Sequence, residues 1–202
     1  MNRPRRSEHT REALITAGID QLSKHGYHGT GIKQILDEVN VPKGSFYNFF
    51  ASKEAFVAEV ISHYSRDLLD QLTEFMAEEG KTLNPIEQLR AIYHYSLKQY
   101  ASHDFKKSCL VGSIAIEISA ESEMCRIELE LAMKQWLTFF SAIFKQAQIQ
   151  QLVRDDITPA DMASVYWAAW EGALIKMKMS ADTQPVKRIM ELMIVTLLTN
   201  KK

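Results

Sequence analysis

A turn between two short helical segments, at residues 40–42, constrains this chain more than any other feature. Upstream of it, apolar residues recur at spacings of three and four, which indicates one face of a short helix: Ile32, Ile35, Leu36 and Val39. Pro42 disfavours helical geometry at Val41, so the first helix ends there. A second short helix is predicted at residues 44–50. Two short helices around a tight turn form a helix-turn-helix, whose second helix enters the major groove of DNA.

Helical patterns continue along the rest of the chain. Apolar stripes predict further helices over residues 8–25, 52–75, 84–100, 108–119, 122–150, 158–179 and 184–198. Four residues stand where a side-chain oxygen can cap the first turn of a helix: Thr30, Ser52, Asn84 and Thr158. Gly and Pro are few, and no apolar–polar alternation of the strand type occurs. The sequence therefore predicts an all-α protein of about nine helices.

Composition and charge agree with a helical protein that binds nucleic acid. Apolar residues make up 46% and charged residues 24% of 202 residues, which is typical of a soluble globular protein. No apolar run approaches the roughly 18 residues of a membrane span, and two cysteines set no disulfide framework, so we expect a cytoplasmic protein without a membrane partner. Residues 1–53 hold eight Lys and Arg against five Asp and Glu, which gives them a net charge of +3 within a chain of net charge −1. A basic head on an acidic body is typical of a DNA-binding protein, although so small a difference also arises by chance.

A set of spaced residues extends through and beyond this motif: Thr30, Ile32, Ile35, Val39, Val41, Gly44, Tyr47, Phe50, Lys53 and Glu54. In these residues, over roughly residues 8–56, the chain resembles the TetR family of transcriptional regulators. A second match, over residues 108–119, resembles the C-terminal type of NemR-like and AcuR-like members. The resemblance implies a three-helix DNA-binding domain at residues 1–52 and a helical effector-binding and dimerisation domain at residues 53–202. It also implies a homodimeric repressor that a small hydrophobic or electrophilic effector releases from a near-palindromic operator.

Candidate DNA contacts lie in and around the second helix of the motif. Lys43, Ser45, Phe46 and Asn48 are candidates for the groove face, since Asn can bond adenine edges and Ser can serve either base. Tyr47 and Lys53 are assigned to phosphates, as is Thr30. A side chain at Gly44 would crowd the turn or the DNA backbone. Asn48 stands where His is frequent in the family, so base preference cannot be carried over.

Two of these assignments have alternatives. Arg5 and Arg6, with Arg3, form an N-terminal arm that either enters a minor groove or is a solvated tail. The three phenylalanines of the motif are also candidates for core packing, an interpretation that we prefer for Phe49 and Phe50.

Aromatic residues in the body suggest an apolar effector pocket. Its candidate lining is Tyr93, Cys109, Trp136, Phe140, Tyr166 and Trp170. Cys109 follows two lysines at the expected start of a helix, and both features favour the reactive thiolate. In NemR-like repressors a cysteine of this segment senses electrophiles and oxidants, so the resemblance implies that role for Cys109. The alternatives are that the aromatic residues form core and that Cys109 is an inert buried thiol.

Residues 158–198 are the candidate dimer interface. Small residues that permit close helix approach and methionines with adaptable surfaces recur there: Ala163, Ala169, Gly172, Ala173, Met162, Met177, Met190 and Met193. The alternative is that the same residues pack within one chain.

Enzymatic function is disfavoured because none of the common catalytic or cofactor motifs occurs. HExxH, paired CxxC, GxGxxG and P-loop patterns are absent from the sequence, and the six histidines are scattered, so we expect neither a metal nor a cofactor. The second alternative is a helical small-molecule-binding or scaffold protein without an operator. The intact set of Gly44, Tyr47 and Lys53 argues against it.

Overall fold

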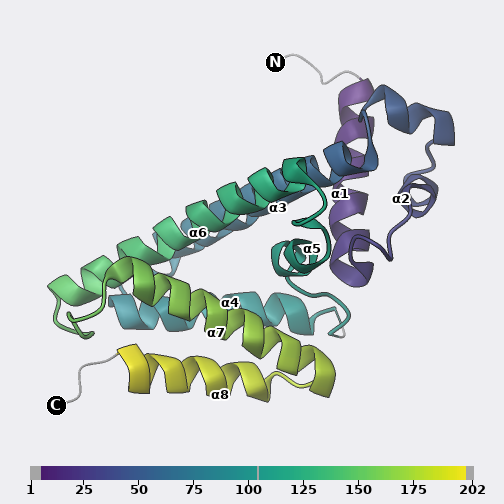
Figure 1. The fold of residues 1–202 in the computed structure, drawn as a ribbon. Helices are drawn as coiled ribbons and strands as arrows, with labels where there is room; N and C mark the ends of the chain where they lie inside the picture. Colours follow the sequence, from purple (N-terminus) through teal and green to yellow (C-terminus); the bar gives the residue numbers. More distant parts are fainter. Residues whose placement is uncertain (1–5, 104, 199–202) are drawn as a thin grey trace. The chain divides into compact units, whose positions relative to one another are not determined.

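The computed structural model describes residues 6–103 and 105–198, and it is all-α throughout that range, as predicted (Figure 1). The elements are α1 (Arg6–His25), α2 (Ile32–Glu38), η1 (Lys43–Asn48), α3 (Lys53–Glu78), α4 (Pro85–Ala101), α5 (Leu110–Ile118), α6 (Glu123–Ile149), α7 (Pro159–Ser180), α8 (Gln184–Leu192) and η2 (Met193–Leu198). No helix in these two ranges is long and apolar enough to cross a membrane.

Side-chain caps set the starts of three helices where the sequence predicts them. The Asn84 side chain accepts hydrogen bonds from the backbone N–H groups of Ile86 (3.0 Å) and Glu87 (3.1 Å), and Glu87 accepts one in return from the Asn84 N–H. Ser52 Oγ accepts from the Ala55 N–H, and Thr158 Oγ1 caps α7. Such caps satisfy N–H groups that have no partner within the helix.

Thr30 does not cap α2. The N-cap residue is Gly31, and Gln34 reaches back to its N–H. The Thr30 hydroxyl instead donates a hydrogen bond of 2.7 Å to the carbonyl oxygen of Gly26, and the side chain is buried. The predicted cap at Thr30 was therefore wrong, because the packing of α1 buries this side chain and pairs its hydroxyl with the Gly26 carbonyl oxygen.

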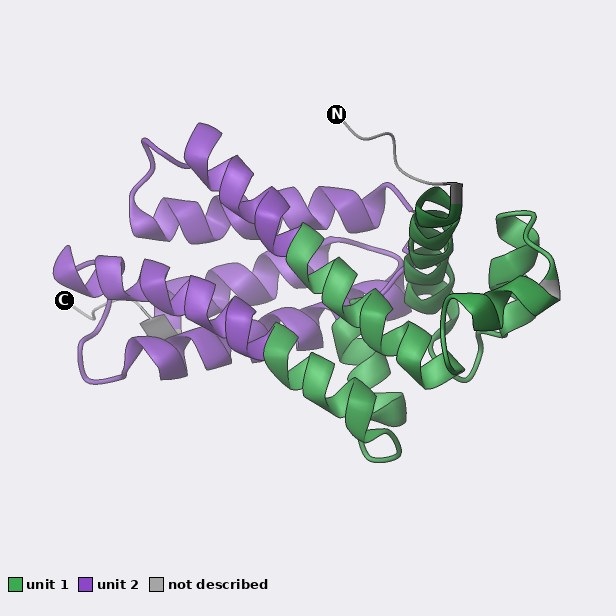
Figure 2. Cartoon of the chain, turned by 90° about the horizontal axis from the view of Figure 1, so that it is seen from above, with its two compact units in different colours: residues 1–67, 109–132 green, residues 68–108, 133–202 purple. Residues whose placement is uncertain are grey.

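The chain forms two compact units (Figure 2). The first contains residues up to Asp67 together with residues 109–132, and the second contains residues 68–108 and the chain from residue 133 onward. The units therefore do not follow the expected boundary after residue 52, since the first half of α3, all of α5 and the start of α6 pack with the N-terminal helices. The boundary of the DNA-binding domain itself stays a prediction.

Each unit has its own apolar core. In the first unit, α1 packs against α2 and α5, and the rings of Phe46, Phe50 and Phe56 meet at centroid distances of 4.8–5.4 Å. In the second unit, α8 packs against α4 and α7. Tyr166 lies against Phe140 and Phe144 at 4.8 and 6.0 Å.

Candidate DNA-binding and effector-binding sites

The segment predicted to read DNA is a short 3₁₀ helix, η1, rather than a turn of α-helix. Its bonds connect residues three apart: the Ser45 N–H donates to the Pro42 carbonyl and the Phe49 N–H to the Phe46 carbonyl. Tyr47 is 60% exposed and Asn48 is exposed, while Ser45 is half-buried. These three side chains can therefore be reached by a partner.

Phe46 cannot contact DNA in this conformation. Its side chain has no exposed surface, and its ring lies 5.3 Å from Phe50 and 5.4 Å from Phe56. The groove-facing role predicted for Phe46 was wrong, because this aromatic ring fills the core beneath η1. The Tyr47 ring lies edge-to-face with the Phe46 ring, and the Tyr47 side chain stays accessible.

Gly44 is exposed, and its backbone does not require glycine. A Cβ atom built at this position would have no neighbour within 4 Å, so the protein's own turn would not be crowded. The turn-crowding reason given for Gly44 was wrong. The remaining reason is the approach of a partner's backbone to the start of η1, which stays a prediction.

Lys53 and Thr30 are held by the protein itself. Lys53 Nζ donates a 2.7 Å hydrogen bond to the Tyr27 carbonyl and lies 4.0 Å from the centre of the Tyr27 ring. Partial burial lowers the pKa of Lys53. Thr30 is 1% exposed, so its side chain is closed to phosphate, although Lys53 keeps unused donors and its phosphate role stays a prediction.

The carboxylate of Glu117, on α5, is hydrogen-bonded to the turn that precedes α2. Glu117 Oε2 accepts a 2.9 Å hydrogen bond from the His28 N–H, and a Cβ at Gly26 would lie 2.0 Å from Glu117 Oε1. Gly26 has a φ of +72°, so glycine is required there on both counts. This contact could not be predicted from the sequence, since 89 positions separate its partners.

Neighbouring polar groups lock the start of α3. The Tyr27 hydroxyl donates to Glu54 Oε1 at 3.0 Å, and the Cys125 thiol donates to the Glu54 carbonyl at 3.6 Å. Burial, reinforced by the Glu54 carboxylate, raises the pKa of Tyr27 to about 12. The Ser52 hydrogen bond is the largest cause that lowers the pKa of Glu54.

The remaining basic candidates are only partly described. Arg5 lies outside the described residues. Arg6 begins α1 and Lys43 begins η1, and nothing is described of either side chain.

The second unit contains a cavity with about 440 Å³ of empty space, part of it open to solvent. Five of the six residues predicted to line an effector pocket meet in its wall: Tyr93, Trp136, Phe140, Tyr166 and Trp170. The other lining residues are Leu68, Leu69, Leu72, Ile92, Ser96, Phe139 and Trp167. That this cavity binds an effector stays a prediction.

Cys109 does not line this cavity. It belongs to the first unit, is only 3% exposed and occupies the N-cap position of α5. The expected helix start is therefore correct, but the grouping of Cys109 with the aromatic residues is not found here.

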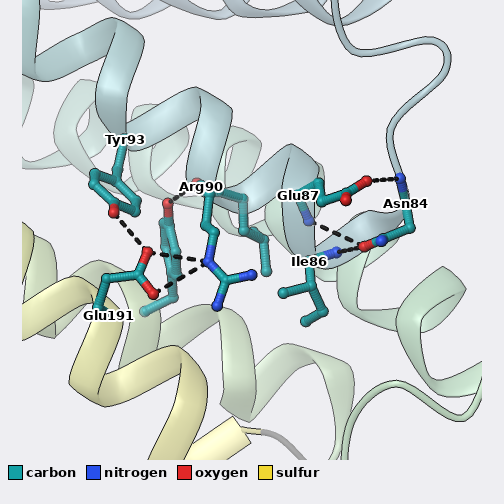
Figure 3. A network of polar contacts seen from close by, with 8 residues as sticks. Asn84, Ile86, Glu87, Arg90, Tyr93 and Glu191 are labelled. Atoms are coloured by element: carbon teal, nitrogen blue, oxygen red, sulfur yellow. Dashed lines mark hydrogen bonds and ion pairs between the residues drawn. The ribbon is translucent and has the colours of Figure 1, made fainter.

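A polar network fixes the Tyr93 wall of the cavity to α8 (Figure 3). The Tyr93 hydroxyl donates to Glu191 Oε1 at 2.7 Å, and Arg90 Nε donates to both oxygens of Glu191 at 3.0 and 3.1 Å. Burial would raise the pKa of Glu191, but the hydrogen bonds from Arg90 and Tyr93 outweigh it, and the pKa lies below its ordinary value. Burial and Glu191 together raise the pKa of Tyr93.

Most residues named for the dimer interface are buried within one chain. Ala163, Ala173 and the four methionines of that set belong to the core of the second unit, so the core alternative holds for them. The apolar or small residues that are exposed on α7 share only Gly172 with that set, and they recur at heptad-like spacing: Val165, Ala168, Gly172, Ile175 and Met179. Leu192 on α8 and Val195 on η2 are exposed as well.

No group of three or more His, Cys, Asp and Glu residues suited to a metal ion occurs within residues 6–103 and 105–198. The distinctive features of these residues are therefore an exposed segment on a helix-turn-helix, a cavity lined by aromatic residues and an uncovered apolar stripe.

Comparison with known proteins matches both parts of the chain. Residues 14–60 match the family described as bacterial regulatory proteins, tetR family, and residues 85–193 match the tetracyclin repressor-like C-terminal domain. The transcriptional regulator AcuR of Cereibacter sphaeroides is 32% identical over 87% of this chain and 79% of its own length. Two solved structures are similar along nearly the whole length. A regulatory protein TetR from Rhodobacter sphaeroides has a TM-score of 0.85 at 28% identity, covering 92% of this chain and 97% of that one. The reduced form of Escherichia coli NemR has a TM-score of 0.83 at 25% identity, covering 96% and 98%.

Proposed function

Because the chain belongs to the TetR family of DNA-binding transcriptional regulators, we propose that it is a repressor released from its operator by a small hydrophobic or electrophilic effector. The observation that carries the proposal is the joint presence of an accessible η1 and an apolar cavity in one chain. The family consists of regulators and not of enzymes.

Base recognition is assigned to Asn48 and Ser45, and phosphate contact to Tyr47. Asn48 and Tyr47 are exposed on η1, where an amide can bond an adenine edge and a phenol can reach the backbone. Lys43 and Gly44 stand at the start of the same segment, where a backbone phosphate can approach closely.

The exposed stripe on α7 supports a homodimer. Val165, Ile175 and Met179 would be covered by the same face of a second copy, since a two-fold axis places identical patches together. A two-fold dimer would bind a near-palindromic operator with half-sites about one helical turn or slightly more apart. Sedimentation velocity tests this: wild type and Ile149→Glu, which alters an exposed residue of α6, should be dimeric, and Ile175→Glu should be monomeric.

Release requires that the effector prefer the DNA-free state. Coupling free energies of about 1–3 kcal/mol are typical of such switches. Helix α3 starts at Lys53 and also supplies Leu68, Leu69 and Leu72 to the cavity wall, so a ligand that displaces these leucines acts on the helix that carries Lys53.

Cys109 offers a second route for electrophiles. Its NemR relative is described as solved in a reduced form, which makes a redox response a natural hypothesis for this chain. Cys109 occupies the N-cap position of α5, and the other end of this helix carries Glu117, which accepts a hydrogen bond from the His28 N–H. A bulky adduct at the buried Cys109 thiol would displace α5 and with it the end that carries Glu117.

The test of the function is a gel shift with the DNA upstream of the protein's own gene. Binding that survives competitor DNA supports a regulator, and its absence supports the scaffold alternative. For the thiol route, N-ethylmaleimide should release the DNA from wild type and Cys125→Ser but not from Cys109→Ser. Burial raises the pKa of the Cys125 thiol, which lowers its reactive thiolate fraction. Equal release from all three proteins would contradict the thiol route and leave the ligand route standing.

A further inference from the structure

We propose that the cavity of the second unit takes an uncharged, planar aromatic molecule that carries one hydrogen-bonding group, and that Ser96 pairs with that group. The proposal rests on the proposed function only in treating this cavity as the effector site. Its chemistry follows from the cavity wall itself.

The wall offers no charge to a ligand. None of its twelve residues is ionisable as an acid or base near neutral pH, and its two tyrosines have raised pKa values because burial disfavours the phenolate. Glu191 lies behind Tyr93 and is already paired with Arg90 and Tyr93. An anion or a cation would therefore lose its hydration without gaining a partner of opposite charge.

The wall is suited to flat rings. Seven of its twelve residues are aromatic, and pairs among them are tilted and not stacked: Trp136 and Trp167 at 55°, Phe140 and Tyr166 at 39°. Tilted neighbours present both edges and faces, which are the surfaces that a further ring packs against.

Ser96 is the polar group of the wall whose hydroxyl is uncommitted. The Tyr93 hydroxyl donates to Glu191 and the Tyr166 hydroxyl to the Leu89 carbonyl at 3.0 Å. Serine in a helix commonly bonds the carbonyl four residues earlier, as Ser119 and Ser164 do in this chain. Ser96 makes no such bond, nor any other hydrogen bond to the residues that the structure describes, so its hydroxyl is available to a ligand.

The experiment compares four probes that share one skeleton of two fused aromatic rings. Naphthalene is apolar, quinoline places one acceptor in the same ring system, 1-methylquinolinium carries a positive charge and 1-naphthoate a negative one. Binding to the full-length protein is measured by equilibrium dialysis at pH 8, where quinoline is neutral. We expect the two neutral probes to bind more tightly than both ions, with quinoline ahead of naphthalene.

Ser96→Ala isolates the polar contact. A single hydrogen bond should change the ratio of the quinoline and naphthalene dissociation constants by about three- to tenfold in favour of naphthalene. Ser164→Ala is the matched control, because the same substitution there removes an exposed hydroxyl from α7 outside the cavity wall. Melting curves establish that both variants are folded.

Each outcome decides a part of the proposal. Tighter binding of either ion overturns the uncharged class, and the cation in particular would make the rings a cage for ammonium groups. An unchanged ratio in Ser96→Ala overturns the role of Ser96, and failure of all probes to bind overturns the aromatic class. Probe binding without release of DNA in the gel shift would contradict the proposed function while leaving the ligand class intact.

Discussion

Replacing Phe46 and Tyr47 by alanine, one at a time, separates structural from DNA-contacting residues in η1. The two are sequence neighbours with opposite environments, since Phe46 is fully buried and Tyr47 is 60% exposed. Phe46→Ala removes a ring that contacts Phe50 and Phe56, and such a deletion costs about 3–5 kcal/mol, because it loses burial and leaves a cavity. Tyr47→Ala removes exposed surface and should change stability by no more than about 0.5 kcal/mol.

The cost at Phe46 is large on the scale of a whole unit. Small domains are stable by about 5–15 kcal/mol, so Phe46→Ala should lower the unfolding midpoint strongly and lose DNA binding through partial unfolding. Phe46→Leu keeps most of the apolar volume, so both its unfolding midpoint and its DNA binding should be closer to those of wild type. Tyr47→Phe should keep wild-type stability and lose about ten- to a hundredfold in affinity, the value of one hydrogen bond to a charged phosphate.

Urea unfolding followed by circular dichroism gives the stabilities, and fluorescence anisotropy with the upstream DNA gives the affinities. A Phe46→Ala protein that unfolds like wild type but no longer binds DNA would refute the assignment of Phe46 to the core. A Tyr47→Ala protein as unstable as Phe46→Ala would refute the exposed position of Tyr47.

Three further predictions concern other contacts. Asn48→Ala should alter the preferred sequence in a randomised-operator selection, whereas Tyr47→Phe should weaken binding to all sequences alike. The carboxyl of Glu191 has a lowered pKa, so its ionised form stabilises the fold at pH values above the unfolded pKa of about 4.3, and this stabilisation is lost as the pH falls through the folded pKa. In thermal melts between pH 6 and 3, the melting temperature of Glu191→Gln should therefore fall less steeply with pH than that of wild type. Glu117→Ala should cost about 1 kcal/mol and weaken DNA binding because the His28 N–H loses its acceptor, and equal melting midpoints for it and wild type would contradict this.

Local chemistry explains which helices could be predicted. The Asn84 and Thr158 caps act on residues two or three positions away, so a single stretch of sequence contains both the donor and the acceptor. The position of Thr30 was misjudged for a related reason. As a cap, its hydroxyl oxygen would accept a hydrogen bond from a backbone N–H of α2, whereas in the structure the hydroxyl donates to the Gly26 carbonyl oxygen, which follows α1. Only the packing of α1 decided between these two arrangements.

The orientation of η1 could not be predicted from periodicity. Phe46, Phe49 and Phe50 supply aromatic rings at several spacings, and six residues of 3₁₀ helix do not define one apolar face as a longer α-helix does. The buried ring was identified only once α3 placed Phe56 against it. The exposed stripe of α7 was missed apart from Gly172 for a different reason. Val165, Ile175 and Met179 are as apolar as the buried residues of the same helix, so composition did not separate the two faces.

Five of the aromatic residues that line the cavity were predicted from the sequence, whereas its serine and aliphatic lining residues were not. Large rings such as Trp136 and Trp170 stand out in any helix, whereas Leu68 and Leu72 belong to an ordinary apolar stripe and Ser96 to an ordinary polar face. A residue can be identified as lining the cavity only when its neighbours across the cavity are known, and these come from α3, α4, α6 and α7.

The thiol route and the ligand route depend on different residues, so they can be tested separately. Cys109 and Glu117 lie at the two ends of α5, a helix of nine residues or about 14 Å, which is short enough to move as one body. An adduct at Cys109 would therefore reach the His28 turn inside the first unit, without involving the cavity of the second unit. If so, Cys109→Ser should still release DNA with quinoline and fail to do so with N-ethylmaleimide, while Glu117→Gln, which keeps an acceptor for the His28 N–H, should respond to both. Loss of the quinoline response in Cys109→Ser would show that the two routes are one.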